Sequence, residues 1–220
     1  MYVKGILSTL KTAVVDSNKI IQFSPPRTGS TLIYNTLIKV FGKRKVYKTH
    51  DPYFTNSMLD FCYVVTTYRH PLDMVASDLQ RFNLEPSDEN VFRRAGYLLS
   101  QGTLWEVLRI VKYTNVLSLK YESFYHDYDY IFNNMERFFS ISIPENLKHE
   151  MLQKLNIETI KSKASKYENF HQYDSVTHIH GRHVSPFKGQ PHYYKNFFSS
   201  NQKYYLQSMF KEYIESLDYE

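Results

Sequence analysis

Short apolar runs alternate with longer stretches of helical spacing along the first half of the chain. Residues 31–41 (TLIYNTLIKVF) place apolar side chains three and four positions apart, which predicts a helix, and Gly42 is a typical residue to end it. Four compact apolar or β-branched runs predict buried strands at 19–24, 45–49, 61–68 and 116–121. Strands that alternate with helices favour an α/β fold with a central parallel sheet flanked by helices.

The second half of the chain has a mostly helical pattern. Helices are predicted from Pro71 onward, within 91–113 as one or two segments, over 130–139, over 145–155, and after Ser199 as a final helix. Residues 160–198 have little periodicity, and a long irregular stretch in a compact domain is usually functional or mobile. No repeat or linker interrupts the sequence, so residues 1–220 are expected to form a single domain.

Composition narrows the class of protein only a little. The 27 Lys and Arg residues exceed the 22 Asp and Glu residues, a mild excess that favours an anionic ligand without requiring nucleic acid. Cys62 is the only cysteine, which excludes an internal disulfide and favours a reducing compartment. Residues 1–19 have neither a signal-peptide pattern nor a membrane-spanning pattern. A soluble cytoplasmic protein, bacterial-type or viral, is therefore expected.

Residues 25–31 (PPRTGST) join the first predicted strand to the first predicted helix. The start of a helix offers free N–H groups and the positive end of the helix dipole, which together attract an anion. Gly29 would let the backbone approach a ligand closely, and Arg27 would add a charge suited to phosphate or sulfate oxygens. Hydroxyl donors come from Thr28, Ser30 and Thr31. The alternative is a capped turn with a solvated arginine.

The same loop differs from the loop that binds nucleoside triphosphates. It lacks the second Gly and the Lys of G-x-x-x-x-G-K-[ST], and no acidic strand end stands out as a magnesium ligand. These differences argue against an ATPase or a kinase.

Two further segments place polar side chains at the carboxyl ends of predicted strands, where ligands gather in parallel sheets. Arg69 follows the third strand, and Ser77 lies about two turns into the next helix. Lys48 and His50 follow the second strand, and a histidine there can act as a general base near neutral pH. The alternatives are an ordinary strand–Pro–helix junction and a structural histidine.

Taken together, these segments resemble the sulfotransferases that use 3'-phosphoadenosine-5'-phosphosulfate (PAPS). PPRTGST resembles the family's P-loop-like phosphosulfate-binding loop, YRHPLDMVAS (68–77) its 3'-phosphate element, and YKTHDP (47–52) the stretch that carries its catalytic histidine. LKYES (119–123) resembles the strand end whose tyrosine lies near the adenine. FKGQPHYYKNFF (187–198) keeps the spacing of the family's last motif, with Tyr194 in the place of a tryptophan.

The resemblance implies a role for each matching residue. His50 would be the general base, while Lys48 and Arg27 would stabilise charge during transfer. The nucleotide would be bound by Arg27, Thr28, Gly29, Ser30, Thr31, Arg69, Ser77, Tyr121, Lys188 and Gly189. The reaction would move a sulfuryl group from PAPS to a hydroxyl or amine, would release 3'-phosphoadenosine-5'-phosphate (PAP), and would need no metal. The acceptor would be a small molecule, a lipid or a carbohydrate, with specificity residing in loops 52–60, 82–92 and 160–186.

The sequence departs from the family pattern at several positions. Phe187 and His192 replace an arginine and a glycine of the last motif, and Arg182 is a candidate for the missing cation. Arg27 stands where cytosolic members have a lysine, and Leu32 stands where they have a tryptophan. Some branches use an acidic base, which leaves Asp51 as an alternative to His50.

Two other functions and one other site remain as alternatives. The chain could be a small-molecule kinase, or a degenerate family member that binds a nucleotide or an acidic glycan without catalysis. The histidines at 178, 180 and 183 suggest zinc, but no cysteine joins them, and structural zinc usually recruits thiolates. No metal site is therefore expected.

Overall fold

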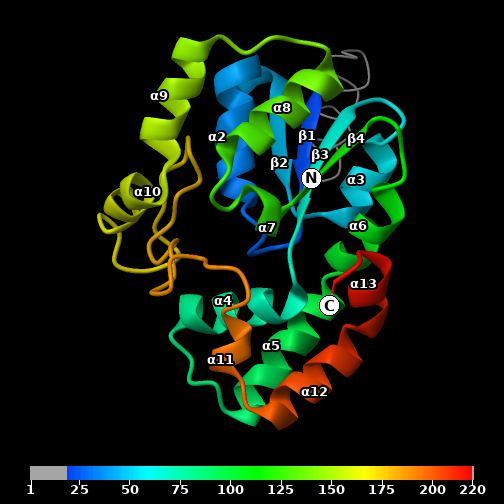
Figure 1. The fold of residues 1–220 in the computed structure, drawn as a ribbon, viewed down its shortest axis with the longest axis vertical. Coiled ribbons are helices and arrows are strands. Elements are labelled where there is room, and N and C mark those ends of the chain that lie inside the picture. Colours follow the sequence, from blue (N-terminus) through cyan, green and yellow to red (C-terminus); the bar gives the residue numbers. More distant parts are fainter. Residues whose placement is uncertain (1–18, 220) are drawn as a thin grey trace, which may run out of the picture.

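The computed structural model describes residues 19–219. All four predicted strands are confirmed: β1 (Ile20–Phe23), β2 (Val46–Thr49), β3 (Tyr63–Tyr68) and β4 (Val116–Lys120). They pair in parallel in the order β2-β1-β3-β4 (Figure 1). Because the strands are parallel, the segments that follow them meet at one edge of the sheet. The predictions for residues 1–18 lie outside the described residues.

Helices cover both faces of the sheet. One face carries α2 (Ser30–Phe41), α8 (Tyr128–Phe139) and α9 (Glu145–Leu155), and the other carries α3 (Pro52–Met58) and α6 (Thr103–Ile110). Neighbouring strand residues divide between the two layers, since side chains alternate along a strand. Ile20 and Val65 pack towards α2, while Ile21 and Val64 pack towards α3 and α6. This double burial explains why the strands are uninterrupted apolar runs.

A third group of helices lies beyond the carboxyl edge of the sheet (Figure 1). It contains α4 (Pro71–Phe82), α5 (Asp88–Ser100), α11 (Tyr194–Phe197), α12 (Ser200–Met209) and α13 (Lys211–Ser216). The region predicted as one or two helices is two, because Gly102 adopts a left-handed φ of 69° between α5 and α6. Ser199 does cap the last helical region, but that region breaks at Phe210 into α12 and α13.

The stretch predicted to be irregular, 160–198, is helical only at its ends. The helix α10 (Ile157–Ala164) reaches into it, and α11 occupies its far end. Turns and one isolated bridge, between Tyr173 and His180, make up the part between them. A 3-10 turn η1 (Lys43–Lys45) and the short helix α7 (Tyr121–Phe124) complete the described elements.

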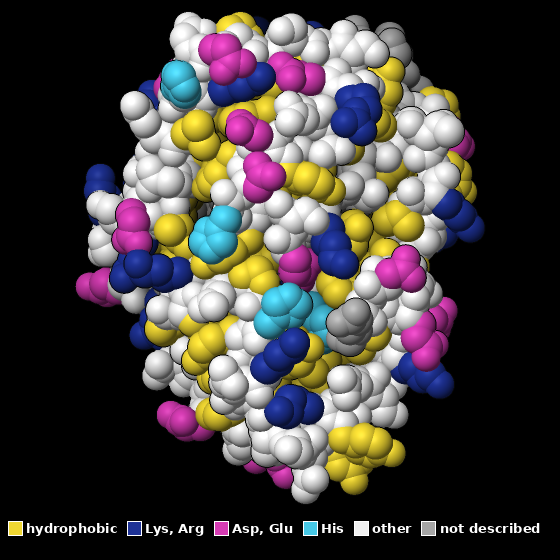
Figure 2. All heavy atoms as spheres, in the orientation of Figure 1, with side chains coloured by type: hydrophobic (Ala, Val, Ile, Leu, Met, Phe, Trp, Pro, Cys, Tyr) yellow, Lys and Arg dark blue, Asp and Glu magenta, His cyan; other side chains and the backbone are white. Residues whose placement is uncertain are grey.

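The surface and the helices add two general observations. On the face drawn in Figure 2, Lys and Arg side chains are interspersed with Asp and Glu side chains. Among residues 19–219, no helix combines the length and the apolar character that crossing a membrane requires.

Candidate functional site

A cavity of about 650 Å³ opens where the carboxyl edge of the sheet faces the third group of helices. Thirteen residues were assigned from the sequence to donor binding or catalysis, and eleven of them line it: Arg27, Gly29, Ser30, Thr31, Lys48, His50, Arg69, Ser77, Tyr121, Lys188 and Gly189. Thr28 and Arg182 are the two that do not. Segments that are up to 162 residues apart in sequence, from Arg27 to Gly189, thus share one wall, because the parallel sheet brings its strand ends together.

The loop before α2 is shaped for close approach by a ligand. Gly29 precedes the helix with a φ of 81°, a conformation that favours glycine. A Cβ atom at this position would lie 2.9 Å from the ring of Phe124. No side chain caps the helix. The N–H groups of Leu32 and Ile33 donate to the Gly29 carbonyl, which leaves those of Ser30 and Thr31 available to an anion in the cavity.

Thr28 faces the protein interior instead of the cavity. Its side chain is fully buried, and its hydroxyl donates to the carbonyl of Pro25 at 2.8 Å. It also hydrogen-bonds with the hydroxyl of Thr67 at 2.7 Å, which ties the loop to β3. The Thr28 hydroxyl is therefore occupied in shaping the loop, in contrast to the donor role expected from the sequence.

Arg27 connects two of the predicted motifs. Its Nε donates to Ser77 Oγ at 2.9 Å, so the loop before α2 meets the second turn of α4. Burial is the main cause that lowers the pKa of Arg27 from 12.5 to about 10. The residue has a φ of 70°, which is strained for a residue with a side chain. An arginine held in this way is a charge fixed in position.

Lys48 lies beside the start of α2. Its Nζ donates to Thr31 Oγ1 at 2.8 Å, which places the ammonium at the N-terminal turn of the helix. Burial, followed by the nearby charge of Arg81, lowers the pKa of Lys48 from 10.5 to about 7. Both effects disfavour a positive charge, so a bound anion would restore the protonated form.

His50 occupies the rim of the cavity and is exposed there. Its Nδ1 lies 2.5 Å from the carbonyl oxygen of Ser24. A carbonyl only accepts, so Nδ1 carries the proton and Nε2 is left unprotonated. Partial desolvation and then the charge of Lys48 lower the pKa of His50 from 6.5 to about 4, although water at the rim screens part of this effect. The imidazole is thus a neutral base at pH 7.

Arg69 extends from the end of β3 and is only 2% exposed. Its Nη2 donates to the carbonyl oxygens of Gly189 at 2.9 Å and Gln190 at 3.3 Å, and its Nη1 donates to that of Arg27 at 3.3 Å. The guanidinium carbon lies 4.1 Å from the centroid of the Tyr121 ring. The Nε atom is buried and has no hydrogen-bond partner among the described residues. One arginine therefore joins three motifs and keeps an unused donor.

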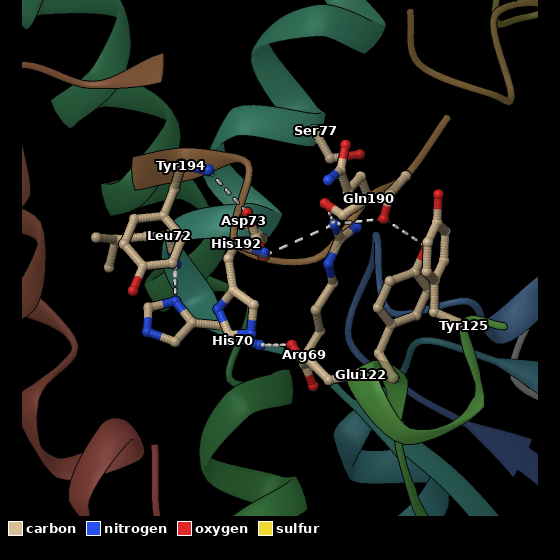
Figure 3. A network of polar contacts seen from close by, with 12 residues as sticks. Arg69, His70, Leu72, Asp73, Ser77, Glu122, Tyr125, Gln190, His192 and Tyr194 are labelled. Atoms are coloured by element: carbon tan, nitrogen blue, oxygen red, sulfur yellow. Dashed lines mark hydrogen bonds and ion pairs between the residues drawn. The ribbon is translucent and has the colours of Figure 1, made fainter. Parts of the chain in front are cut away.

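Asp73 holds the same assembly from the other side (Figure 3). It forms an ion pair with Arg69 at 3.9 Å, and both side chains are buried. Its carboxylate accepts from the backbone N–H groups of His192 at 2.7 Å and Tyr194 at 3.0 Å. Asp73 lies in the first turn of α4, where a carboxylate favours the helix dipole. In the structure it also fastens the C-terminal motif to α4.

The C-terminal motif, residues 187–198, contacts Tyr121. The Tyr121 hydroxyl donates to the carbonyl of Gly189 at 2.8 Å, and burial raises its pKa to about 12. A Cβ atom on Gly189 would lie 2.5 Å from that hydroxyl.

The two cations predicted near this motif do not replace its missing arginine. The Lys188 ammonium pairs with Glu158 at 2.6 Å, and Arg182 is exposed away from the cavity wall. Arg182 is thus not brought to the cavity in place of the motif's missing arginine.

Asp51, the alternative base, lies outside the cavity, whereas Arg81, which the sequence did not single out, lies in its wall. The Asp51 carboxylate caps α3, accepting from the backbone N–H groups of Tyr53 and Phe54, and it does not line the cavity. Arg81 does line the cavity, although the sequence analysis missed it. The available signal was its position four residues after Ser77, which puts both on one helix face.

The cavity wall also includes the histidines 178, 180 and 183. Burial lowers the pKa of all three rings, so they are uncharged at neutral pH. They add ring surface and hydrogen-bonding capacity without adding charge.

No protein-family model matches the sequence, and no curated protein matches it. The fold, in contrast, is shared with solved structures. Mouse sulfotransferase SULT7A1 complexed with PAP aligns with a TM-score of 0.69 at 17% identity, over 94% of this chain and 88% of that chain. Retinol dehydratase in complex with androsterone and the inactive cofactor PAP gives 0.66 at 14% identity, over 92% and 82%. The same enzyme with retinol and PAP gives 0.63 at 14% identity, over 92% and 83%. The chain has the sulfotransferase fold.

Proposed function

We propose that this protein is a PAPS-dependent sulfotransferase that transfers a sulfuryl group to a hydroxyl-bearing acceptor. The observation that carries the proposal is the contact between Lys48 Nζ and Thr31 Oγ1 at 2.8 Å. It joins the anion-binding start of α2 to the strand end that bears a neutral histidine base, two residues further on. Phosphosulfate binding and proton removal would then take place in one cavity.

The residues of the cavity suit the donor. The free N–H groups of α2 and the close approach at Gly29 would hold the 5'-phosphosulfate. The unused Nε of Arg69, with Ser77, would serve the 3'-phosphate. Tyr121 and Gly189 would support Arg69 from the opposite side. Thr28 would contribute through the shape of the loop, and Lys188 through the cavity wall.

His50 would act as general base. Its Nε2 would take the proton of the acceptor hydroxyl as that oxygen attacks sulfur, while the bond between sulfur and the bridging phosphate oxygen breaks. The bonding electron pair would leave with PAP. Lys48 and Arg27 would stabilise the charge that grows on the leaving phosphate. Fixed positions and charges supply most of the catalysis in such in-line transfers, which fits a cavity built from tethered cations.

Ligand-dependent stabilisation tests this proposal against the kinase alternative. A ligand that binds only the native state raises the unfolding temperature. PAP is expected to raise it strongly, and MgATP at equal concentration is expected to raise it little. Transfer of label from PAPS to a panel of hydroxyl acceptors then separates an enzyme from a degenerate binder. Stabilisation by MgATP alone would favour a kinase instead.

The pH dependence of kcat/KM for PAPS is expected to report the pKa values of Lys48 and His50 in the free protein. The rate should fall as pH rises through about 7, because Lys48 loses its proton there. It should also fall as pH decreases towards about 4, where His50 becomes charged. The donor's negative charge stabilises the Lys48 ammonium, so the alkaline limb of kcat should lie at higher pH. Lys48→Arg should move that limb of kcat/KM well above pH 7, and persistence of the limb would assign it to another group.

A further inference from the structure

Arg81 is a cation in the cavity wall without a counter-charge. It lies on α4 one turn after Ser77 and is half-buried. Its guanidinium carbon lies 3.0 Å from the centroid of the Phe170 ring. Its Nε is buried and has no hydrogen-bond partner among the described residues, which also form no ion pair with it. Stacking on a ring holds the guanidinium plane in place while leaving its edge for a ligand.

No neighbouring carboxylate neutralises this charge. None of the described residues that line the cavity is Asp or Glu. The nearest acidic influence on Arg81 is Asp78, and that carboxylate is engaged by Arg94, whose Nε donates to Asp78 Oδ2 at 2.6 Å. Burial lowers the pKa of Arg81 to about 9, as expected for a positive charge that lacks a partner. The missing negative charge must therefore come from a bound molecule or from solvent.

Arg81 lies near the donor residue Arg27, whose charge helps to lower the pKa of Arg81, but its guanidinium stacks on a different segment of the chain. Phe170 belongs to loop 160–186, where acceptor specificity is expected, and its ring stacks on that of His180 with 4.2 Å between the ring centroids. The charge of Arg81 also lowers the pKa of His50, which agrees with a position on the His50 side of the cavity. The same side holds Thr103, whose Oγ1 is buried and also lacks a partner among the described residues. The glycine before Thr103 lies against Pro52, two residues after His50. Arg81 and Thr103 thus bring two donors without partners among the described residues to the cavity that holds His50.

On the basis of the proposed function, we propose that Arg81 binds an oxyanion of the acceptor. The physiological acceptor is then an acidic molecule in which a carboxylate or similar group accompanies the reacting hydroxyl. The planar guanidinium fork matches a carboxylate in a bidentate geometry. Phe170 would hold the fork in register, and Thr103 would donate a further hydrogen bond. The donor's own phosphates would be served by Arg27, Lys48 and Arg69.

Matched acceptor pairs that differ in charge test this inference. The probes are 4-hydroxyphenylacetate with its methyl ester, and phenyl glucuronide with phenyl glucoside, titrated into the PAP-loaded protein. The unsubstituted protein should bind the anionic member of at least one pair about tenfold or more tightly. Arg81→Gln should abolish that preference and leave the neutral member and PAP within about twofold. Arg81→Lys, which keeps the charge but not the fork, should retain part of it.

Arg93→Gln is the matched control, because Arg93 is exposed on α5 and bonds only to Asn90 among the described contacts. It should change none of these affinities. Equal binding of both members of every pair by the unsubstituted protein would overturn the inference. So would a loss of PAP affinity in Arg81→Gln, which would assign Arg81 to the donor. Failure of the unsubstituted protein to bind PAP would contradict the proposed function instead, and the anion preference is then measured on the free protein.

Discussion

Replacing His50 by alanine is expected to lower the rate of sulfuryl transfer from PAPS by about 10²- to 10⁴-fold, the usual contribution of a general base. The Nδ1 proton is held by the Ser24 carbonyl, and Nε2 is the unprotonated nitrogen that would accept the acceptor's proton. His50 lies at the rim, so its loss should leave PAP affinity within about twofold. Single-turnover transfer of label and calorimetric titration with PAP measure the two quantities.

Two companion variants separate base catalysis from positioning. His50→Asn keeps an N–H donor for the Ser24 carbonyl but has no basic nitrogen, so it should be as inactive as the alanine variant. Asp51→Asn keeps the oxygen that caps α3 and removes the alternative acid, so it should stay active. Normal turnover in either His50 variant, or its loss in Asp51→Asn, would contradict the assignment of His50 as the base.

Replacing Arg69 by alanine should have the largest effect on both stability and nucleotide selectivity. Removing a buried charge that pairs with Asp73 and binds three backbone carbonyls is expected to cost about 3–5 kcal/mol of unfolding free energy. It should also weaken PAP by about 30-fold or more, as for truncation of a buried hydrogen-bonded charge, and 5'-AMP much less. Urea unfolding and competition titrations measure these effects.

Selectivity is the readout that a merely structural role would not change. Loosening of the fold would weaken PAP and 5'-AMP alike, whereas loss of a 3'-phosphate contact lowers only the ratio of their affinities. Ser77→Ala provides the matched test, because it removes one hydroxyl without removing a buried charge. It should lower the same ratio with a small change in stability. Equal losses for both nucleotides in both variants would exclude the 3'-phosphate role.

The sequence predicted the strands well because each is buried on both faces and therefore reads as an apolar run. It also predicted which segments follow the strands, and the parallel order of the sheet then brings them to one edge. Helix breaks were less predictable. The apolar spacing continues through Phe210, so nothing local marks the end of α12. The helical ends of 160–198 are short, and such segments depend on packing more than on pattern.

The site residues show the same division between what the sequence pattern predicts and what the packing decides. The sequence by itself determined which residue types could serve an anion and a base, since PPRTGST, YKTHDP and YRHPLDMVAS are continuous and their chemistry is local. Only the tertiary structure decided which side chains reach the cavity. Thr28 turns inward to Thr67, Arg182 stays exposed, and Arg81 enters the wall to stack on Phe170. Each of these outcomes depends on a partner at least 39 residues away or on solvent, and a contact of that range leaves no periodic trace in the chain.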